Sequence, residues 1–136
     1  MNATTQSWML LLGRSLIGLL FVVFGIRSII YTAGFAGYLT KLGFPAPEVL
    51  AWVAIIIEVG AGVLLILGWK TQWAAWLLVV FVAIAVIMAH RFWQFDAAQY
   101  ANQLAHFLKG LAIIGALLYV IAFGPGAMSL DGRKGR

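Results

Sequence analysis

Four long apolar runs dominate this sequence, and they leave few folds open to it. The second run, residues 46–68, reads APEVLAWVAIIIEVGAGVLLILG and carries Glu58 in its middle. A helix of about 20 apolar residues spans the hydrocarbon core of a bilayer. Only 10% of the 136 residues are charged, whereas a soluble domain has about 25% charged residues. The chain is therefore predicted to be an integral membrane protein.

The apolar runs predict an all-α bundle of four membrane-spanning helices. We expect the spans at about residues 8–30, 47–68, 73–90 and 103–124. Each run is too long for a membrane barrel strand, which alternates in polarity over about 10 residues. Backbone groups in lipid must bond internally, which also favours helices. The Gly-rich connector 31–46 leaves room for a short amphipathic helix, and residues 1–136 are assigned to a single membrane domain.

The basic residues of the loops set the expected orientation. Four spans put both termini on one side, together with the short turn at residues 69–72. That side carries Lys70 and the basic tail, against Lys41 and Arg91 in the loops on the other side. Cytoplasmic loops are enriched in lysine and arginine, so both termini are predicted to be cytoplasmic. The basic tail suits anionic lipid headgroups, and nucleic acid is not an expected partner.

An ionisable Glu58 near the bilayer midplane needs a proton or a cation. Arg14 is the best candidate partner, because it lies about 9 Å into the first span from the side of the 69–72 turn. Small residues that let helices approach closely flank both groups: Gly18 and Gly25 beside Arg14, and Gly60 and Gly62 beside Glu58. Two interpretations stay open. The pair is either a structural ion pair that fixes helix register, or Glu58 carries a proton or binds a ligand.

A second group of basic residues lies toward the opposite ends of the spans. Its members are Arg27, His90, His106 and Lys109. His106 and Lys109 are three residues apart and are neighbours on one helical face. The group is a candidate pocket for an anion, a quinone headgroup or a lipid phosphate. In the alternative, Arg27 and Lys109 reach to lipid headgroups while the histidines cap loops.

The absence of cysteine limits the redox chemistry that this chain can carry. The sequence contains no cysteine, which excludes disulfide exchange and thiolate-bound metals in this chain. Two histidines separated by a loop lack a recognised metal-ligand spacing, so no metal site is predicted. The chain is expected to hold no cofactor of its own, and a bound quinone is the small molecule that the basic pocket would suit.

Several short motifs, taken in order, resemble those of DoxX-type membrane proteins. They are R-x-x-x-G-x-x-F at residues 14–21, Gly-x-Pro at 43–45, E-x-G-x-G at 58–62, a histidine closing the third span (His90) and G-P-G-x-x-S-L-D at 124–131. The resemblance covers nearly the whole chain. It implies a small four-helix protein of the bacterial inner membrane that crosses the membrane several times.

The resemblance also implies a function. Some DoxX-like proteins are named as the membrane subunit of a thiosulfate:quinone oxidoreductase, and others are associated with redox-stress complexes. This implies a quinone-facing or anchoring subunit of a membrane oxidoreductase complex, with a soluble oxidoreductase subunit as its partner. Because the chain has no redox-active pair of side chains, it would take part in catalysis only as a subunit.

Two functions of other classes stay open from the residues. One is a small proton-coupled transporter, working as a homo-oligomer, in which Glu58 binds a proton and a substrate in turn. An ion pair with Arg14 would argue against this function, because a paired carboxylate resists protonation near neutral pH. The other is a structural protein without chemistry that stabilises another membrane protein.

Overall fold

The computed structural model describes residues 2–134, and the regular structure of that part is helical throughout. Its elements are α1 (Ala3–Ile30), α2 (Thr32–Lys41), α3 (Pro47–Leu67), α4 (Thr71–Ala89), the 3-10 helix η1 (Phe92–Gln94), α5 (Ala97–Phe123) and α6 (Leu130–Lys134). The helices α1, α3, α4 and α5 are long and apolar enough to cross a membrane. The predicted all-α bundle of four spans is confirmed, and the connector 31–46 holds α2.

Two of the spanning helices begin earlier than the apolar runs do. Helix α1 begins at Ala3 and α5 at Ala97, several residues ahead of the predicted spans. The side chains of Asn2 and Asp96 each accept a hydrogen bond from the backbone N–H three residues on, at 2.8 and 3.1 Å. Such N-caps stabilise the first turn of a helix. Each helix therefore continues beyond its apolar run into polar residues.

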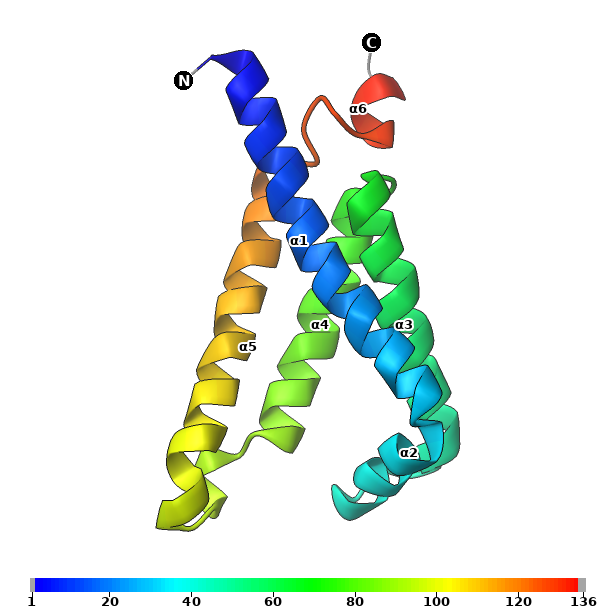
Figure 1. Ribbon diagram of the computed structural model, residues 1–136, viewed down its shortest axis with the longest axis vertical. Helices are drawn as coiled ribbons and strands as arrows, with labels where there is room; N and C mark the ends of the chain where they lie inside the picture. Colours follow the sequence, from blue (N-terminus) through cyan, green and yellow to red (C-terminus); the bar gives the residue numbers. More distant parts are fainter. Residues whose placement is uncertain (1, 135–136) are drawn as a thin grey trace.

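The bundle consists of two helix pairs that meet at one end and diverge toward the other (Figure 1). Helix α1 packs mainly against α3, and α4 packs mainly against α5, while contacts between α3 and α4 join the pairs. Helix α2 folds back against α3 at the diverging end. The start of α1 and the end of the described chain lie together at the opposite end, as four spans require.

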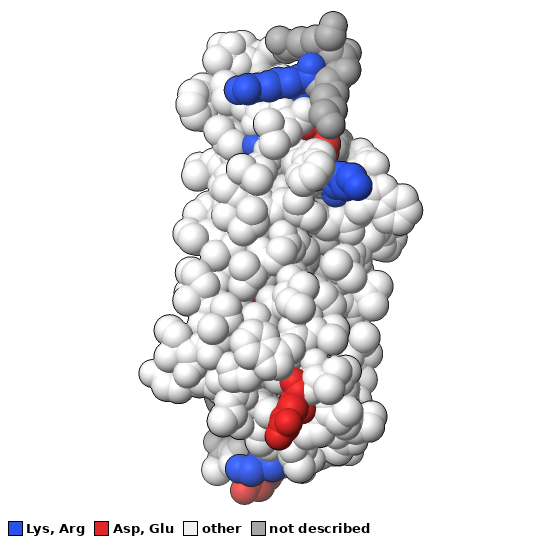
Figure 2. Space-filling model, turned by 90° about the vertical axis from the view of Figure 1, so that its right-hand side faces the viewer, with Lys and Arg blue, Asp and Glu red and all other residues white. Residues whose placement is uncertain are grey.

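Which end faces the cytoplasm stays a prediction from the loop charges. The last two residues of the basic tail, 135–136, lie outside the described residues, so the expected contact of the tail with lipid headgroups also stays a prediction. Figure 2 shows the charged side chains of one face gathered toward its two ends, with a broad uncharged band between them. Large apolar side chains are exposed on the spans, among them Ile56 and Trp73. Such a surface suits lipid.

The helices α1 and α3 approach each other so closely that only glycine fits at several contact points. A Cβ added to Gly18 would lie 2.5 Å from the carbonyl oxygen of Gly62. A Cβ added to Gly25 would lie 2.6 Å from Cγ2 of Val59. The main apolar core lies beside this contact and includes Phe21 of α1. Backbone-to-backbone packing of this kind is common where small residues line facing membrane helices.

The expectation that Gly60 takes part in this packing is wrong. Gly60 is exposed, and a Cβ built on it would meet no atom within 4 Å. At 3.6 residues per turn, position 60 lies about 200° around α3 from positions 58 and 62. Gly62 faces α1, and Gly60 therefore points away from it.

Gly18→Val tests the close approach of α1 and α3. The added side chain must push the two backbones apart, and overpacking of this kind costs about 1–3 kcal/mol. Gly13→Val on the same helix is the matched control, because a Cβ at Gly13 meets no atom within 4 Å. Unfolding titrations with SDS in mixed micelles measure both variants. Equal unfolding midpoints for the two would contradict the packing described here.

Candidate functional site

Arg14 is buried, with 3% of its surface exposed, and its guanidinium bonds backbone carbonyls. Nε donates to the carbonyl oxygen of Leu65 in α3 at 3.1 Å. The terminal nitrogens donate to the carbonyl oxygens of Pro125 and Met128, in the segment that follows α5. A guanidinium presents five N–H donors in a rigid fork, which suits several fixed acceptors at once. Arg14 thus joins the C-terminal segment to α1 and α3.

The same segment is fixed a second time through Asp131. Its carboxylate accepts hydrogen bonds from the backbone N–H groups of Lys70 and Thr71, at 3.0 and 2.9 Å, and from the Thr71 hydroxyl at 2.9 Å. The N–H of Asp131 donates to the carbonyl of Gly68 at 2.9 Å. An acidic group at a helix N-terminus is stabilising, so Asp131 caps α4. We call residues 124–131 the C-terminal clasp.

The expected ion pair between Arg14 and Glu58 is wrong. Helices α1 and α3 run antiparallel, and Gly25 lies level with Glu58, since a Cβ on Gly25 would lie 3.2 Å from Cβ of Glu58. Arg14 instead lies level with Leu65, to which it donates. Leu65 is seven residues beyond Glu58, or about 10 Å along the helix. The interpretation of Glu58 as a structural ion pair with Arg14 is thereby removed.

Glu58 faces a cavity of about 350 Å³. Its Oε2 atom is buried and has no hydrogen-bond partner within the described part of the chain. Leaving a buried polar group without a partner costs about 1–3 kcal/mol. An orphan of this kind in a native fold needs an explanation, and a ligand or water that completes the site is one. The cavity is therefore the candidate functional site.

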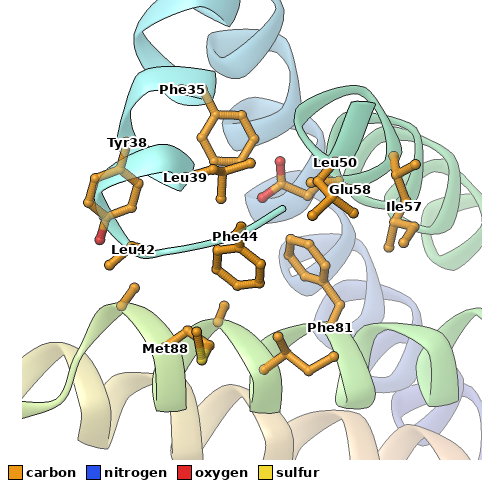
Figure 3. Close-up of a pocket in the computed structure, with 15 residues that line it drawn as sticks. Phe35, Tyr38, Leu39, Leu42, Phe44, Leu50, Ile57, Glu58, Phe81 and Met88 are labelled. Atoms are coloured by element: carbon orange, nitrogen blue, oxygen red, sulfur yellow. The ribbon is translucent and has the colours of Figure 1, made fainter. Parts of the chain in front are cut away.

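Three elements line this cavity, which we call the α2–α4 pocket (Figure 3). They contribute Phe35, Tyr38, Leu39, Leu42 and Phe44 from α2 and its loop, Leu50, Val53, Ala54, Ile57 and Glu58 from α3, and Phe81, Ile84, Ala85, Met88 and Ala89 from α4. Apart from the carboxyl of Glu58 and the phenol of Tyr38, these side chains are apolar. Sites for small lipophilic ligands typically combine an apolar wall with a few polar groups.

Tyr38 lies on α2 at the edge of this pocket. Burial raises the pKa of its phenol above the ordinary value, because the phenolate would lose hydration. The group therefore keeps its proton at neutral pH and is a hydrogen-bond donor.

Nothing in the sequence pointed directly to this pocket, although the connector 31–46 carried one signal. Phe35, Tyr38 and Phe44 place three aromatic rings within ten residues there. Aromatic residues near a span end are usually interfacial anchors, and only the fold-back of α2 turns these rings toward Glu58. Phe81 and Met88 lie within an apolar run, where position alone does not separate a pocket from the lipid-facing surface.

The structure brings together two of the four basic residues of the second predicted group. The rings of His90 and His106 are stacked, with centroids 4.9 Å apart and planes 15° apart. Nδ1 of His90 lies 2.9 Å from Oε1 of Gln103, within hydrogen-bond distance. These contacts link the end of α4 to α5.

The prediction that the four basic residues form a single pocket is wrong. Lys109 on α5 and Arg27 on α1 are both exposed, and α1 and α5 diverge at this end of the bundle (Figure 1). Arg27 is therefore separated from the histidine pair. The lining of the α2–α4 pocket includes neither these two residues nor His90 and His106.

The site suits an organic molecule better than a metal ion. Within residues 2–134, no three His, Cys, Asp or Glu side chains lie together in a way that could hold a metal. A ligand in the α2–α4 pocket would be held by apolar packing and by a hydrogen bond to Glu58. The pocket thus calls for a molecule with an apolar body and a polar group.

Comparison with known proteins identifies the family. The family model for DoxX matches residues 9–91, which is more than half of the chain. The chain belongs to the DoxX family. The matched region runs from α1 to the end of α4, so it includes Arg14, Glu58 and the whole lining of the α2–α4 pocket.

Two curated relatives of this DoxX-family protein come from Escherichia coli (strain K12). Inner membrane protein YphA is 32% identical over 125 residues, which cover 92% of this chain and 89% of the relative. Inner membrane protein YqjF is 30% identical over 121 residues, covering 89% and 88%. With four spanning helices, the DoxX-family protein is a multi-pass protein of the inner membrane.

A eukaryotic relative is much longer than this chain. The Surfeit locus protein 4 homolog of Schizosaccharomyces pombe is 30% identical over 105 residues, which cover 74% of this chain but only 33% of the relative. No solved structure matches the chain.

Arg14→Met tests the C-terminal clasp. The change leaves the carbonyls of Pro125 and Met128 without their donor, whereas the Leu65 carbonyl still accepts from the N–H of Gly68. Each unsatisfied buried group costs about 1–3 kcal/mol, so we expect a loss of at least about 2 kcal/mol in unfolding free energy, together with faster proteolysis after residue 124. Arg27→Met is the matched control, because Arg27 is exposed. A clasp that resists protease equally in both variants would argue against the role of Arg14.

Proposed function

We propose that this DoxX-family protein is the quinone-binding membrane subunit of an oxidoreductase complex. In this proposal the quinone ring occupies the α2–α4 pocket beside Glu58. The observation that carries it is an apolar cavity of about 350 Å³ whose one carboxylate has a buried oxygen without a partner among residues 2–134. The resemblance to DoxX-type oxidoreductase subunits supports the proposal.

The chemistry of the pocket fits a quinone in two respects. Phe35, Phe44 and Phe81 offer aromatic rings around the cavity, and offset or edge-to-face ring pairs contribute about 0.5–1.5 kcal/mol beyond burial. The carboxyl of Glu58 is a hydrogen-bond partner for a ring oxygen or hydroxyl. The pocket lies in the spanning part of the bundle, so its ligand comes from the lipid phase.

In this proposal Glu58 binds the quinone oxygen, in place of the basic group that includes His106 and Lys109. That group was predicted as a candidate pocket for a quinone headgroup, but His106 and Lys109 do not line the cavity. The chain has no cysteine and no redox-active side-chain pair, so in this proposal the electrons come from a soluble oxidoreductase subunit. The membrane chain binds the quinone and anchors the complex.

A proton-coupled carrier is the second candidate function. The objection that Arg14 neutralises Glu58 no longer holds, because Arg14 donates to carbonyls instead. A carboxylate in an apolar pocket suits a proton or a lipophilic cation. A purely structural role, the third candidate, requires that Glu58 can be replaced by an apolar residue without loss of function.

Glu58→Leu tests the quinone proposal. In nanodiscs, decylubiquinone should quench the tryptophan fluorescence of the purified protein saturably. We expect Glu58→Leu to weaken this binding at least about tenfold, which corresponds to about 1.4 kcal/mol, and Glu58→Gln to weaken it less because an amide still forms hydrogen bonds. Glu48→Gln is the control, since Glu48 is exposed and does not line the α2–α4 pocket.

Two results would overturn the proposal. One is wild-type protein that shows no saturable binding of decylubiquinone. The other is a Glu58→Leu variant that binds it as tightly as wild type does. Glu58-dependent binding of tetraphenylphosphonium, without binding of decylubiquinone, would point to the carrier instead.

A further inference from the structure

Helix α2 and the residues that follow it form one structural unit. The N–H of Phe44 donates to the carbonyl of Leu39 at 3.1 Å, and the N–H of Gly43 donates to the carbonyl of Thr40 at 3.0 Å. Gly43 has a φ of 83°. Together these features are a Schellman motif, in which the residue after the glycine usually packs on the apolar residue that accepts its hydrogen bond. Phe44 and Leu39 share one apolar cluster, so Phe44 is tied to α2.

This unit packs on α3 through a small cluster of its own. Ala36 and Leu39 of α2 are buried against Ala51, close to the start of α3. This cluster is separate from the main core, which consists of buried apolar residues of α1, α3, α4 and α5 and includes none from α2. The unit can therefore shift without opening the core of the bundle.

Non-helical residues bound the unit at both ends. Tyr31, with φ −114° and ψ 38°, separates α1 from α2. Ala46, with a φ of 46°, precedes α3. A left-handed conformation costs an L-residue other than glycine roughly 1–2 kcal/mol. These are the positions at which a change of backbone angle would swing α2 relative to α3.

The unit also forms one wall of the α2–α4 pocket. Phe35, Tyr38 and Phe44 lie on the α2 side, and Phe81 and Met88 face them from α4. Figure 3 shows Phe44 between α2 and α4, beside Phe81. The α4 wall contacts the main core through Phe81, so the two walls belong to different packing units. A shift of α2 would widen or narrow the opening between them.

We propose that α2 together with residues 42–44 is a door to the α2–α4 pocket. The door swings about Tyr31 and Ala46, and Phe44 closes the passage between α2 and α4. A lipid-soluble ligand passes through this opening to reach Glu58. The inference rests on the proposed function in one respect, that the pocket binds such a ligand. The door controls the rate of exchange, whereas Glu58 controls the affinity.

Phe44→Ala tests the door by removing its closing side chain. Stopped-flow quenching by decylubiquinone in nanodiscs gives the association and dissociation rates. We expect the association rate to rise about tenfold, since lid opening limits exchange in many enclosed sites. The dissociation rate should rise by at least as much, because Phe44 is also one of the rings that line the pocket. Phe95→Ala is the control, because Phe95 is exposed and lies outside the pocket lining. Unchanged rates, or a rise in the dissociation rate alone, would contradict the proposal that α2 acts as a door.

A disulfide that holds α2 against α3 gives an independent test of the door. The chain has no cysteine, and Ala36 of α2 and Ala51 of α3 belong to one buried cluster. In the pair Ala36→Cys and Ala51→Cys, oxidation can therefore form only one intramolecular disulfide, and mass spectrometry confirms that it has formed. We expect exchange of decylubiquinone to slow about tenfold in the cross-linked protein and to recover on reduction. Equal exchange rates of decylubiquinone before and after reduction of the disulfide would contradict the proposal that α2 acts as a door. A wild-type protein that binds no decylubiquinone would instead refute the proposed function, so the two failures are distinguishable.

Discussion

The guanidinium of Arg14 donates to three backbone carbonyls at the end of the bundle where the four spans meet. Leu65 lies in the last turn of α3, whereas Pro125 and Met128 lie in the segment that leaves α5. In lipid, an unsatisfied carbonyl costs several kcal/mol, so one side chain of α1 fixes the ends of two other helices. Asp131 then continues from the same clasp to the start of α4. All four spanning helices are joined at this end.

Because Arg14 is engaged at this end, Glu58, which lies at the level of Gly25, has no hydrogen-bond partner for its buried Oε2 atom among residues 2–134. The helix pairs diverge away from the clasp (Figure 1), and α2 folds into the space beside α3. This gives Glu58 an apolar surrounding on one side and the α2–α4 pocket on the other. The clasp and the α2–α4 pocket thus lie toward opposite ends of the bundle, with the spans joined at the clasp and diverging toward the pocket (Figure 1).

The sequence predicted the spans well, because a membrane requires about 20 apolar residues per helix. It also placed Gly18 and Gly62 on facing helix surfaces. It failed for Arg14, because every residue carries a carbonyl and nothing in the sequence singles out those of Pro125 and Met128. A rare carboxylate such as Glu58 is the more visible partner in the sequence. In the structure, however, Arg14 and Glu58 lie about 10 Å apart along the helix axis, which rules out an ion pair. The fold-back of α2, which completes the pocket, depends on long-range packing that no local pattern encodes.

A pair of double-mutant cycles tests most directly whether Arg14 serves the clasp and leaves Glu58 free. The first cycle combines Arg14→Met with Glu58→Gln, and the second combines Arg14→Met with Asp131→Asn, with unfolding free energies measured in mixed micelles. Groups that share no partner add within about 0.5 kcal/mol, so the first cycle should give a coupling below that value. The second should give a coupling of about 1 kcal/mol or more, because both residues hold the clasp. A coupling of several kcal/mol between Arg14 and Glu58, as a buried ion pair would give, together with none between Arg14 and Asp131, would contradict this account.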